Sequence, residues 1–219
     1  MKVHIDYAIE KLKRNLLSLA ALTEDQLRKS IRALETKDVE LARTIIEDDR
    51  LVDIREVELE EDCLQILALH QPVAHDLRFV IAVLKINNDL ERIADLASNL
   101  AERTLQISSE AIPVIPVDFK EMAGLACSML QGSVDAFINN DALAARAICE
   151  ADLSVDRLHR ENYNFAYRAM QEHPEHSSRM LPMLSISRYL ERAADYATNI
   201  AEDVVYLVEG KIIRHSDSD

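Results

Sequence analysis

The segment Leu90–Glu102, LERIADLASNLAE, decides the fold, because the chain repeats it 100 positions later as LERAADYATNIAE at Leu190–Glu202. Nine of the thirteen positions are identical between the two copies. Self-similarity at a long and fixed offset indicates a duplicated structural unit. The apolar residues of both copies recur at steps of three and four, which is the pattern of a helix with one buried face.

A second block of identities extends the repeat. Ala33–Asp53 matches Ala136–Asp156 at an offset of 103, so both blocks occur in the same order in each half of the chain. Helical periodicity predicts six helices, over residues 5–35, 38–70, 76–108, 118–139, 141–172 and 178–209. Short connections imply antiparallel neighbours. We therefore predict an all-α protein of two tandem, similar three-helix bundles, at 1–108 and 118–219, with a proline-containing linker at 109–117.

Composition and charge narrow the class of function. The 219 residues include only 3 Gly and no Trp, and 48% are hydrophobic, which suits long helices and disfavours a sheet protein. A formal net charge of -14 repels nucleic acid and anionic membrane surfaces, so we expect neither as a partner. No apolar run approaches the roughly 18 residues that span a bilayer. The N-terminus lacks the hydrophobic region of a signal peptide, so we expect a cytoplasmic protein without membrane insertion.

The usual catalytic and metal motifs are missing from the sequence. Cys63, Cys127 and Cys149 are an odd number without close spacing, which disfavours a disulfide framework or a zinc motif, and we interpret them as buried, reduced thiols. We find no Gly-rich phosphate loop, nucleophile elbow or HExxH motif. No His follows a Glu at a distance of three residues, which argues against a di-iron oxidase of the ferritin type.

Acidic residues on the second and third predicted helices are placed symmetrically about the turn between them. Asp49 and Asp95 share a midpoint at Pro72, and so do Asp53 and Glu91. Residues equidistant from the turn of an antiparallel hairpin face each other. We therefore expect these four carboxylates to lie together on adjacent helices.

The second half repeats this symmetry. Its midpoint falls between His173 and Pro174, again in a predicted turn. The four acids that share this midpoint are Asp152, Asp156, Glu191 and Asp195. The sequence therefore predicts one group of four facing carboxylates in each half.

Facing carboxylates repel each other unless a cation lies between them. Like charges at i,i+4 on a helix cost about 0.2–0.5 kcal/mol per pair. Helices in contact lie about 8–10 Å apart, so acids from both helices could share one metal or a small cluster. All-oxygen ligation favours hard cations such as magnesium, calcium or manganese, or iron in a carboxylate cluster. The alternative is a solvated acidic face.

The two groups of acids differ in their surroundings. Glu56 and Glu60, which extend the acidic stripe in the first half, correspond to His159 and Tyr163 in the second half. The second site therefore carries less acidic charge. His159 is either an additional ligand or a structural residue.

Taken together, these motifs resemble those of the PhoU family, whose members regulate bacterial phosphate uptake. The resemblance covers nearly the whole chain. It is carried by the two copies of Leu-Glu-Arg-(Ile/Ala)-Ala-Asp, by Glu47-Asp-Asp-Arg-x-Val-Asp53, and by Gln71-Pro-Val-Ala-His-Asp-Leu-Arg78. The usual family form is Glu-Arg-Ile-Gly-Asp, whereas this chain has Ala94 and Ala194 in place of Gly. Alanine is the better helix former, so the expected fold is unaffected.

The resemblance implies a function as well as a fold. It implies a non-enzymatic adaptor between the ATPase subunit of the phosphate ABC transporter and the phosphate-sensing histidine kinase, which represses the phosphate-starvation response and often forms a homodimer. It also implies a surface site for several metal ions, such as iron, manganese or magnesium, on each bundle. The family's ligand motif maps onto Asp49, Asp53, Glu91, Asp95, Asp152, Asp156, Glu191 and Asp195. The alternatives are a metal-dependent phosphohydrolase and a metal-binding structural helical bundle.

Overall fold

Six long α-helices account for nearly all of residues 2–109, 119–211 and 213, which are the residues that the computed structural model describes. In chain order they are α1 (Lys2–Thr36), α2 (Val39–His70), α3 (Ala74–Ser109), α4 (Lys120–Asn139), α5 (Ala142–Glu172) and α6 (Ser177–Glu209). A one-turn 3-10 helix, η1 (Pro174–His176), joins α5 to α6. No strand occurs among the described residues. The prediction of an all-α protein is therefore confirmed.

The predicted helices agree with the observed ones to within three residues at each end. Two details differ. Ser109, predicted to begin the linker, is still the last residue of α3, and η1 was not predicted because three residues carry no periodicity. Residues 110–118, which include most of the predicted linker and the predicted start of the fourth helix, lie outside the described residues. The division of the chain at 109–117 therefore stays a prediction.

Aspartate caps define where α2 and α5 begin. The backbone N–H of Leu41 donates to Asp38 Oδ1 over 3.0 Å. Asp141 Oδ1 accepts from the backbone N–H groups of Leu143 and Ala144 over 3.0 and 2.9 Å. Each cap satisfies backbone donors that the first helical turn leaves without partners. Asp38 and Asp141 are also equivalent positions of the repeat, so both halves start their second helix with the same device.

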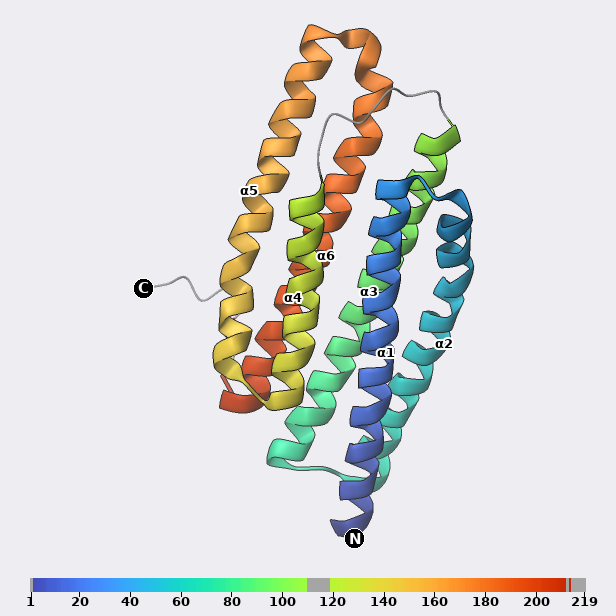
Figure 1. The fold of residues 1–219 in the computed structure, drawn as a ribbon. Coiled ribbons are helices and arrows are strands. Elements are labelled where there is room, and N and C mark those ends of the chain that lie inside the picture. Colours follow the sequence, from blue (N-terminus) through green and yellow to red (C-terminus); the bar gives the residue numbers. More distant parts are fainter. Residues whose placement is uncertain (1, 110–118, 212, 214–219) are drawn as a thin grey trace.

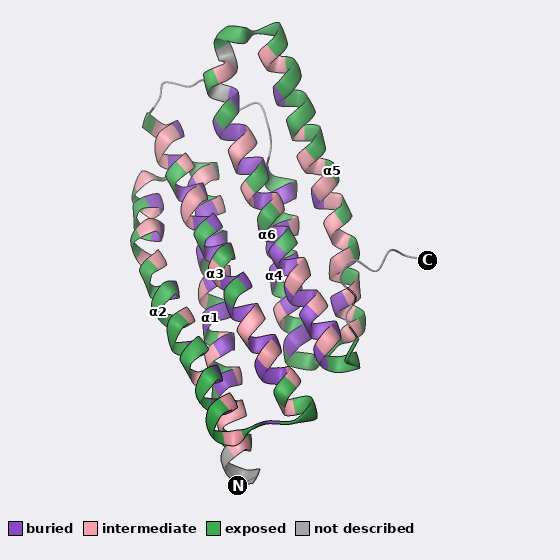
Figure 2. Cartoon of the chain, turned by 180° about the vertical axis from the view of Figure 1, so that it is seen from behind, coloured by how far each residue is buried: buried purple, intermediate pink, exposed green. Residues whose placement is uncertain are grey.

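The two three-helix units lie side by side, with α3 and α6 as the central antiparallel pair (Figure 1). Within one unit α3 packs against α1 and α2, and within the other α6 packs against α4 and α5. Buried residues follow α3 and α6, whereas much of α2 and α5 is exposed (Figure 2). One apolar core runs through both units and includes Leu27, Ile93, Leu130 and Ile200.

Two contacts define the register of the central pair. Lys85 Nζ lies 3.0 Å from Asp203 Oδ1, and the Arg92 guanidinium carbon lies 5.6 Å from the centre of the Tyr196 ring. The partners are seven residues apart on each helix, in opposite directions. This is the register of two antiparallel helices related by an approximate twofold axis.

The same register places Ala94 opposite Ala194 at the centre of the contact. Both residues are fully buried, at 0% exposure. Small side chains at this point let the two helices approach closely. These are the positions at which the PhoU pattern has glycine, so their location explains why only a small residue suits them.

Candidate functional site

The first group of acids, which we call the first carboxylate cluster, consists of Asp49 and Asp53 on α2 with Glu91 and Asp95 on α3. Partial loss of hydration raises the pKa of Asp49, and the charges of Asp95 and Asp53 raise it further. The pKa of Glu91 rises for the same reasons, with contributions from Asp95, Glu56 and Asp53. These effects act between acids of α2 and acids of α3, so the predicted residues lie close together across the hairpin. Their role as metal ligands stays a prediction.

The second carboxylate cluster consists of Asp152 and Asp156 on α5 with Glu191 and Asp195 on α6. Loss of hydration raises the pKa of Asp152 to about 6, and the charges of the other three acids contribute. The pKa of Asp195 also rises to about 6, again through loss of hydration and the charges of Glu191 and Asp156. The Asp152 Oδ1 atom is buried without a hydrogen-bond partner. No hydrogen bond thus offsets the charge on this atom, whereas Asp156 has a cation nearby, with Arg160 Nη1 3.9 Å from its Oδ2.

Two hydroxyl groups accompany the clusters and were missed by the sequence analysis. The hydroxyl of Ser98 lowers the pKa of Asp49, and its Oγ is buried without a regular hydrogen-bond partner. Thr198 occupies the equivalent position on α6, and its hydroxyl is likewise buried without a regular partner. The sequence did carry a signal for them, because the two copies of the repeat have a hydroxyl side chain at the same position, Ser98 and Thr198.

Arginines on the central helices contact one aromatic ring between the two units. The guanidinium carbons of Arg92 and Arg192 both lie 5.6 Å from the centre of the Tyr196 ring. Arg192 Nη2 also donates to the Tyr196 hydroxyl over 2.6 Å. The positive charges lower the pKa of Glu91 and Glu191, respectively, against the larger effects that raise it. Arg92 of α3 and Arg192 of α6 thus meet at one ring between the two units.

Glu56 and His159 occupy equivalent positions of the repeat, and each is hydrogen-bonded to the neighbouring helix of its unit. Asn87 Nδ2 donates to the Glu56 backbone carbonyl over 3.0 Å. In the second unit His159 Nδ1 lies 2.9 Å from Ser187 Oγ. Loss of hydration lowers the pKa of His159, which favours its neutral ring. The hydrogen bond to Ser187 supports the structural interpretation of His159.

The cysteines lie apart from this chemistry. Cys63 and Cys127 are buried, as expected, and Cys149 is half-buried. Burial raises the pKa of Cys63 to about 12 and that of Cys149 to about 11, so both remain protonated thiols near neutral pH.

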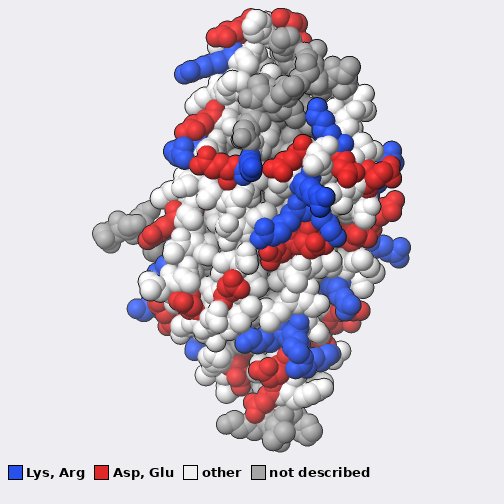
Figure 3. Space-filling model, viewed as in Figure 1, with Lys and Arg blue, Asp and Glu red and all other residues white. Residues whose placement is uncertain are grey.

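Charge is mixed on the face that Figure 3 shows, where acidic and basic side chains lie next to each other. Arg28 bridges the two units on the surface, with its Nη2 donating to Gln131 Oε1 over 3.1 Å. In the described part of the chain, no helix is both long and apolar enough to cross a bilayer.

A comparison with protein families matches the PhoU domain twice, over residues 16–104 and 119–204. The chain belongs to the PhoU family. Each match covers most of one three-helix unit, which agrees with the internal repeat of the sequence. The resemblance inferred from the motifs is thereby confirmed.

Relatives within the PhoU family are similar along almost their whole length. The phosphate-specific transport system accessory protein PhoU homolog of Aquifex aeolicus is 36% identical over 208 residues, which cover 94% of each chain. The homolog of Pseudomonas aeruginosa is also 36% identical, over 94% of this chain and 86% of its own.

Two solved PhoU structures have the same fold. PhoU from Pseudomonas aeruginosa superposes with a TM-score of 0.91 at 36% identity, over 94% of this chain and 99% of that chain. The phosphate transport system regulatory protein PhoU from Streptococcus pneumoniae superposes with a TM-score of 0.88 at 30% identity, over 95% and 99%. The predicted PhoU-like architecture is therefore confirmed.

The two carboxylate clusters offer the oxygen ligands that hard cations prefer, but their side chains are not arranged as complete metal sites. Their donors are carboxylate oxygens, and Asp152 Oδ1 is buried with no partner. Among the described residues, however, no group of three or more His, Cys, Asp or Glu side chains is arranged to hold a metal ion. Binding would thus require the carboxylates to rotate toward a common point.

Proposed function

We propose that this protein is a non-enzymatic regulator of phosphate uptake and of phosphate-starvation signalling. It acts as a cytoplasmic homodimer that binds the ATPase subunit of the phosphate ABC transporter and the phosphate-sensing histidine kinase. Its relatives support the regulatory part of this proposal, since those described above are named as accessory or regulatory proteins of phosphate transport. The similarity extends over 94% of this chain and 99% of the solved PhoU structure from Pseudomonas aeruginosa.

The proposal assigns metal binding to the two carboxylate clusters. In each cluster, two acids from one helix and two from the next would hold divalent or trivalent ions. When bound, a metal would offset the repulsion among the acids and offer coordination positions to phosphate oxygens. The acids themselves keep a compact negative site on adjacent helices, and Ser98 stabilises the ionised form of Asp49.

One observation carries this assignment. Each unit holds four acids on adjacent helices, and burial together with the charges of neighbouring acids raises the pKa values of three of them in each unit. The same positions recur in the second unit at offsets of 103 and 100 residues. Repulsion among carboxylates that recurs in both units costs stability, and groups with perturbed pKa values concentrate at functional sites. A solvated acidic face would not need to repeat the same positions.

The test compares two matched double variants. Asp49→Asn with Asp152→Asn removes one carboxylate from each cluster. Glu47→Gln with Glu150→Gln changes exposed acids at equivalent positions of the same helices. We expect the first variant alone to lose the metal that elemental analysis finds in protein purified without chelators. The same variant should weaken binding to the purified transporter ATPase in isothermal titration calorimetry.

Equal metal content in both double variants would reject the carboxylate sites. Wild-type protein that fails to bind either the transporter ATPase or the kinase would reject the adaptor function. The competing phosphohydrolase predicts phosphate release from a phosphomonoester in the presence of manganese. If the wild type releases phosphate and the Asp49→Asn with Asp152→Asn variant does not, the phosphohydrolase would be favoured instead.

A further inference from the structure

Two surface grooves occupy equivalent positions in the two units. The groove of the first unit is lined on α2 by Asp62, Gln65, Ile66, Leu69 and His70. In the second unit, α5 and its C-cap residue line a groove with residues that lie 103 positions later, Phe165, Arg168, Ala169, Glu172 and His173. The offset is that of the internal repeat. The two grooves are therefore counterparts, and the differences between them show what each can hold.

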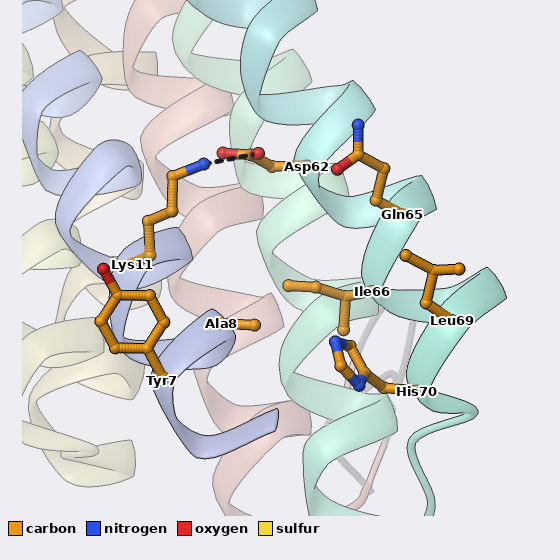
Figure 4. A pocket seen from close by; sticks show the side chains of 8 residues that line it. All are labelled: Tyr7, Ala8, Lys11, Asp62, Gln65, Ile66, Leu69 and His70. Atoms are coloured by element: carbon orange, nitrogen blue, oxygen red, sulfur yellow. Dashed lines mark hydrogen bonds and ion pairs between the residues drawn. The ribbon is translucent and has the colours of Figure 1, made fainter. Parts of the chain in front are cut away.

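The first groove is closed by the N-terminal turns of α1. Tyr7, Ala8 and Lys11 form its other wall (Figure 4). Lys11 Nζ lies 2.9 Å from Asp62 Oδ1, so the helix is fastened across the groove by an ion pair. The remaining cavity is small, about 140 Å³.

The second groove lacks this helical wall. Its counterpart helix, α4, has 20 residues, whereas α1 has 35. Lys120, the first residue of α4, is equivalent to Leu17, so no helix among the described residues takes the place of Lys2–Leu16. At about 1.5 Å per residue the difference amounts to roughly 22 Å of helix. The upper parts of α5 and α6 accordingly extend beyond α4 in Figure 1, and the groove has a volume of about 510 Å³.

The second groove is lined by two apolar residues, Phe165 and Ala169, among polar and charged ones. Phe165, 43% exposed, replaces Asp62, and Ala169 lies one turn further along α5. Arg168 has no ion pair with any described residue, whereas Glu161 is already paired with Arg157 over 2.9 Å. An occupant would thus need an apolar side chain opposite Phe165 and a carboxylate near Arg168.

We propose that this groove binds an amphipathic helix of a partner protein, in the place that the N-terminal turns of α1 take in the first unit. The first unit shows that a helix fits there, since Leu12 and Leu16 of α1 are buried to 0% and 1% exposure. The apolar stripe of the incoming helix packs on Phe165 and Ala169, and its acidic flank pairs with Arg168. The proposal deepens the adaptor function and rests on it only for the identity of the partner.

The probe is a stapled, fluorescent peptide with the sequence of Lys2–Leu16 in which Lys11 is changed to Leu, so that an apolar residue faces Phe165. We expect saturable binding to the full-length protein in fluorescence anisotropy. Phe165→Asp restores the residue of the first unit and should weaken binding about tenfold or more. Leu153→Asp, at a position 69% exposed on the same helix outside the groove, is the control and should leave binding within about twofold.

Three outcomes would overturn the groove proposal. They are no binding by the wild type, equal binding by Phe165→Asp, and binding only after Ile112, Val114, Ile115 and Val117 are changed to Ser. The last would show that the chain's own segment occupies the groove.

A parallel assay separates this proposal from the adaptor function. If the transporter ATPase or the kinase binds the wild type and Phe165→Asp equally, the adaptor stands and the groove proposal is wrong. If the peptide binds in the groove but neither protein does, the groove stands and the adaptor function is wrong.

Discussion

At the scale of single residues, the carboxylate clusters oppose folding. In the second cluster Asp152 and Asp195 have pKa values near 6, well above the usual value of 3.8 for aspartate. Their ionised forms are therefore less favourable in the folded protein than in the unfolded chain. A folded protein that retains such groups has a use for them, and a bound cation would relieve the repulsion.

The first prediction concerns the pH dependence of this effect. A carboxyl whose pKa is raised by folding binds its proton more tightly in the folded state, so its contribution to stability is lost as pH rises from about 4 to 6. Asp195→Asn should therefore stabilise the metal-free protein above pH 6 and have little effect near pH 4. Because Asp195 remains solvent-exposed, we expect a gain on the order of 1 kcal/mol rather than the full value of the shift.

Urea unfolding in the presence of a chelator, at pH 4, 5.5 and 7.5, measures this difference. Glu150→Gln, an exposed acid on α5, is the control and should be neutral at all three pH values. A gain for Asp195→Asn that is equally large at pH 4 would show that repulsion is not its source.

The second prediction concerns the ion pair between the two units. Asp203 is 1% exposed and its partner Lys85 lies 3.0 Å away. Lys85→Met leaves the carboxylate buried without this charge, which should lower the free energy of unfolding by about 2–3 kcal/mol. The double variant with Asp203→Leu should recover most of the loss. A double-mutant cycle by urea unfolding tests this, and additive effects of the two changes would contradict it.

At the scale of helices, contacts between neighbouring helices of one hairpin could be predicted from the sequence. Equal distances from the turn correctly paired Asp49 with Asp95, because an antiparallel hairpin leaves little freedom in register. The contact of Tyr196 with Arg92 was not foreseen. It depends on how α3 meets α6 across about 100 residues of chain, and helical periodicity says which face is apolar but not which helix covers it.

The third prediction concerns the crossing of α3 and α6. Ala94 lies opposite Ala194, and both are fully buried. Ala94→Leu inserts three carbons into the buried contact between α3 and α6, and should destabilise the protein by about 1–3 kcal/mol or more. Ala94→Gly matches the family pattern and should cost only about 1 kcal/mol through helix propensity. Thermal unfolding followed by circular dichroism measures both.

Ala147→Leu, at an exposed position of α5, controls for the change in side-chain size. If Ala94→Leu is as well tolerated as this control, the two helices do not approach closely at Ala94.

At the scale of the whole molecule, the two units are similar but not equivalent. They share caps, clusters and a central pair of helices, yet the second has His159 for Glu56 and a shorter first helix. A duplicated fold with unequal surfaces suits an adaptor, because each half can recognise a different partner. The shorter α4 could be predicted from the sequence, but the groove on α5 could not, since its lining residues are identified only by the folded structure.

The fourth prediction follows from the shared core. One continuous apolar cluster crosses from the first unit to the second, so unfolding either unit would expose the buried face of α3 or α6. We expect a single calorimetric transition whose van't Hoff and calorimetric enthalpies agree. Asp38→Ala and Asp141→Ala remove equivalent helix caps from the two units, at a cost of about 1 kcal/mol each. Each should lower the temperature of the whole transition by a similar amount. Two transitions, with each variant shifting only one, would show that the units fold independently and that the α3–α6 contact is a docking surface rather than part of one core.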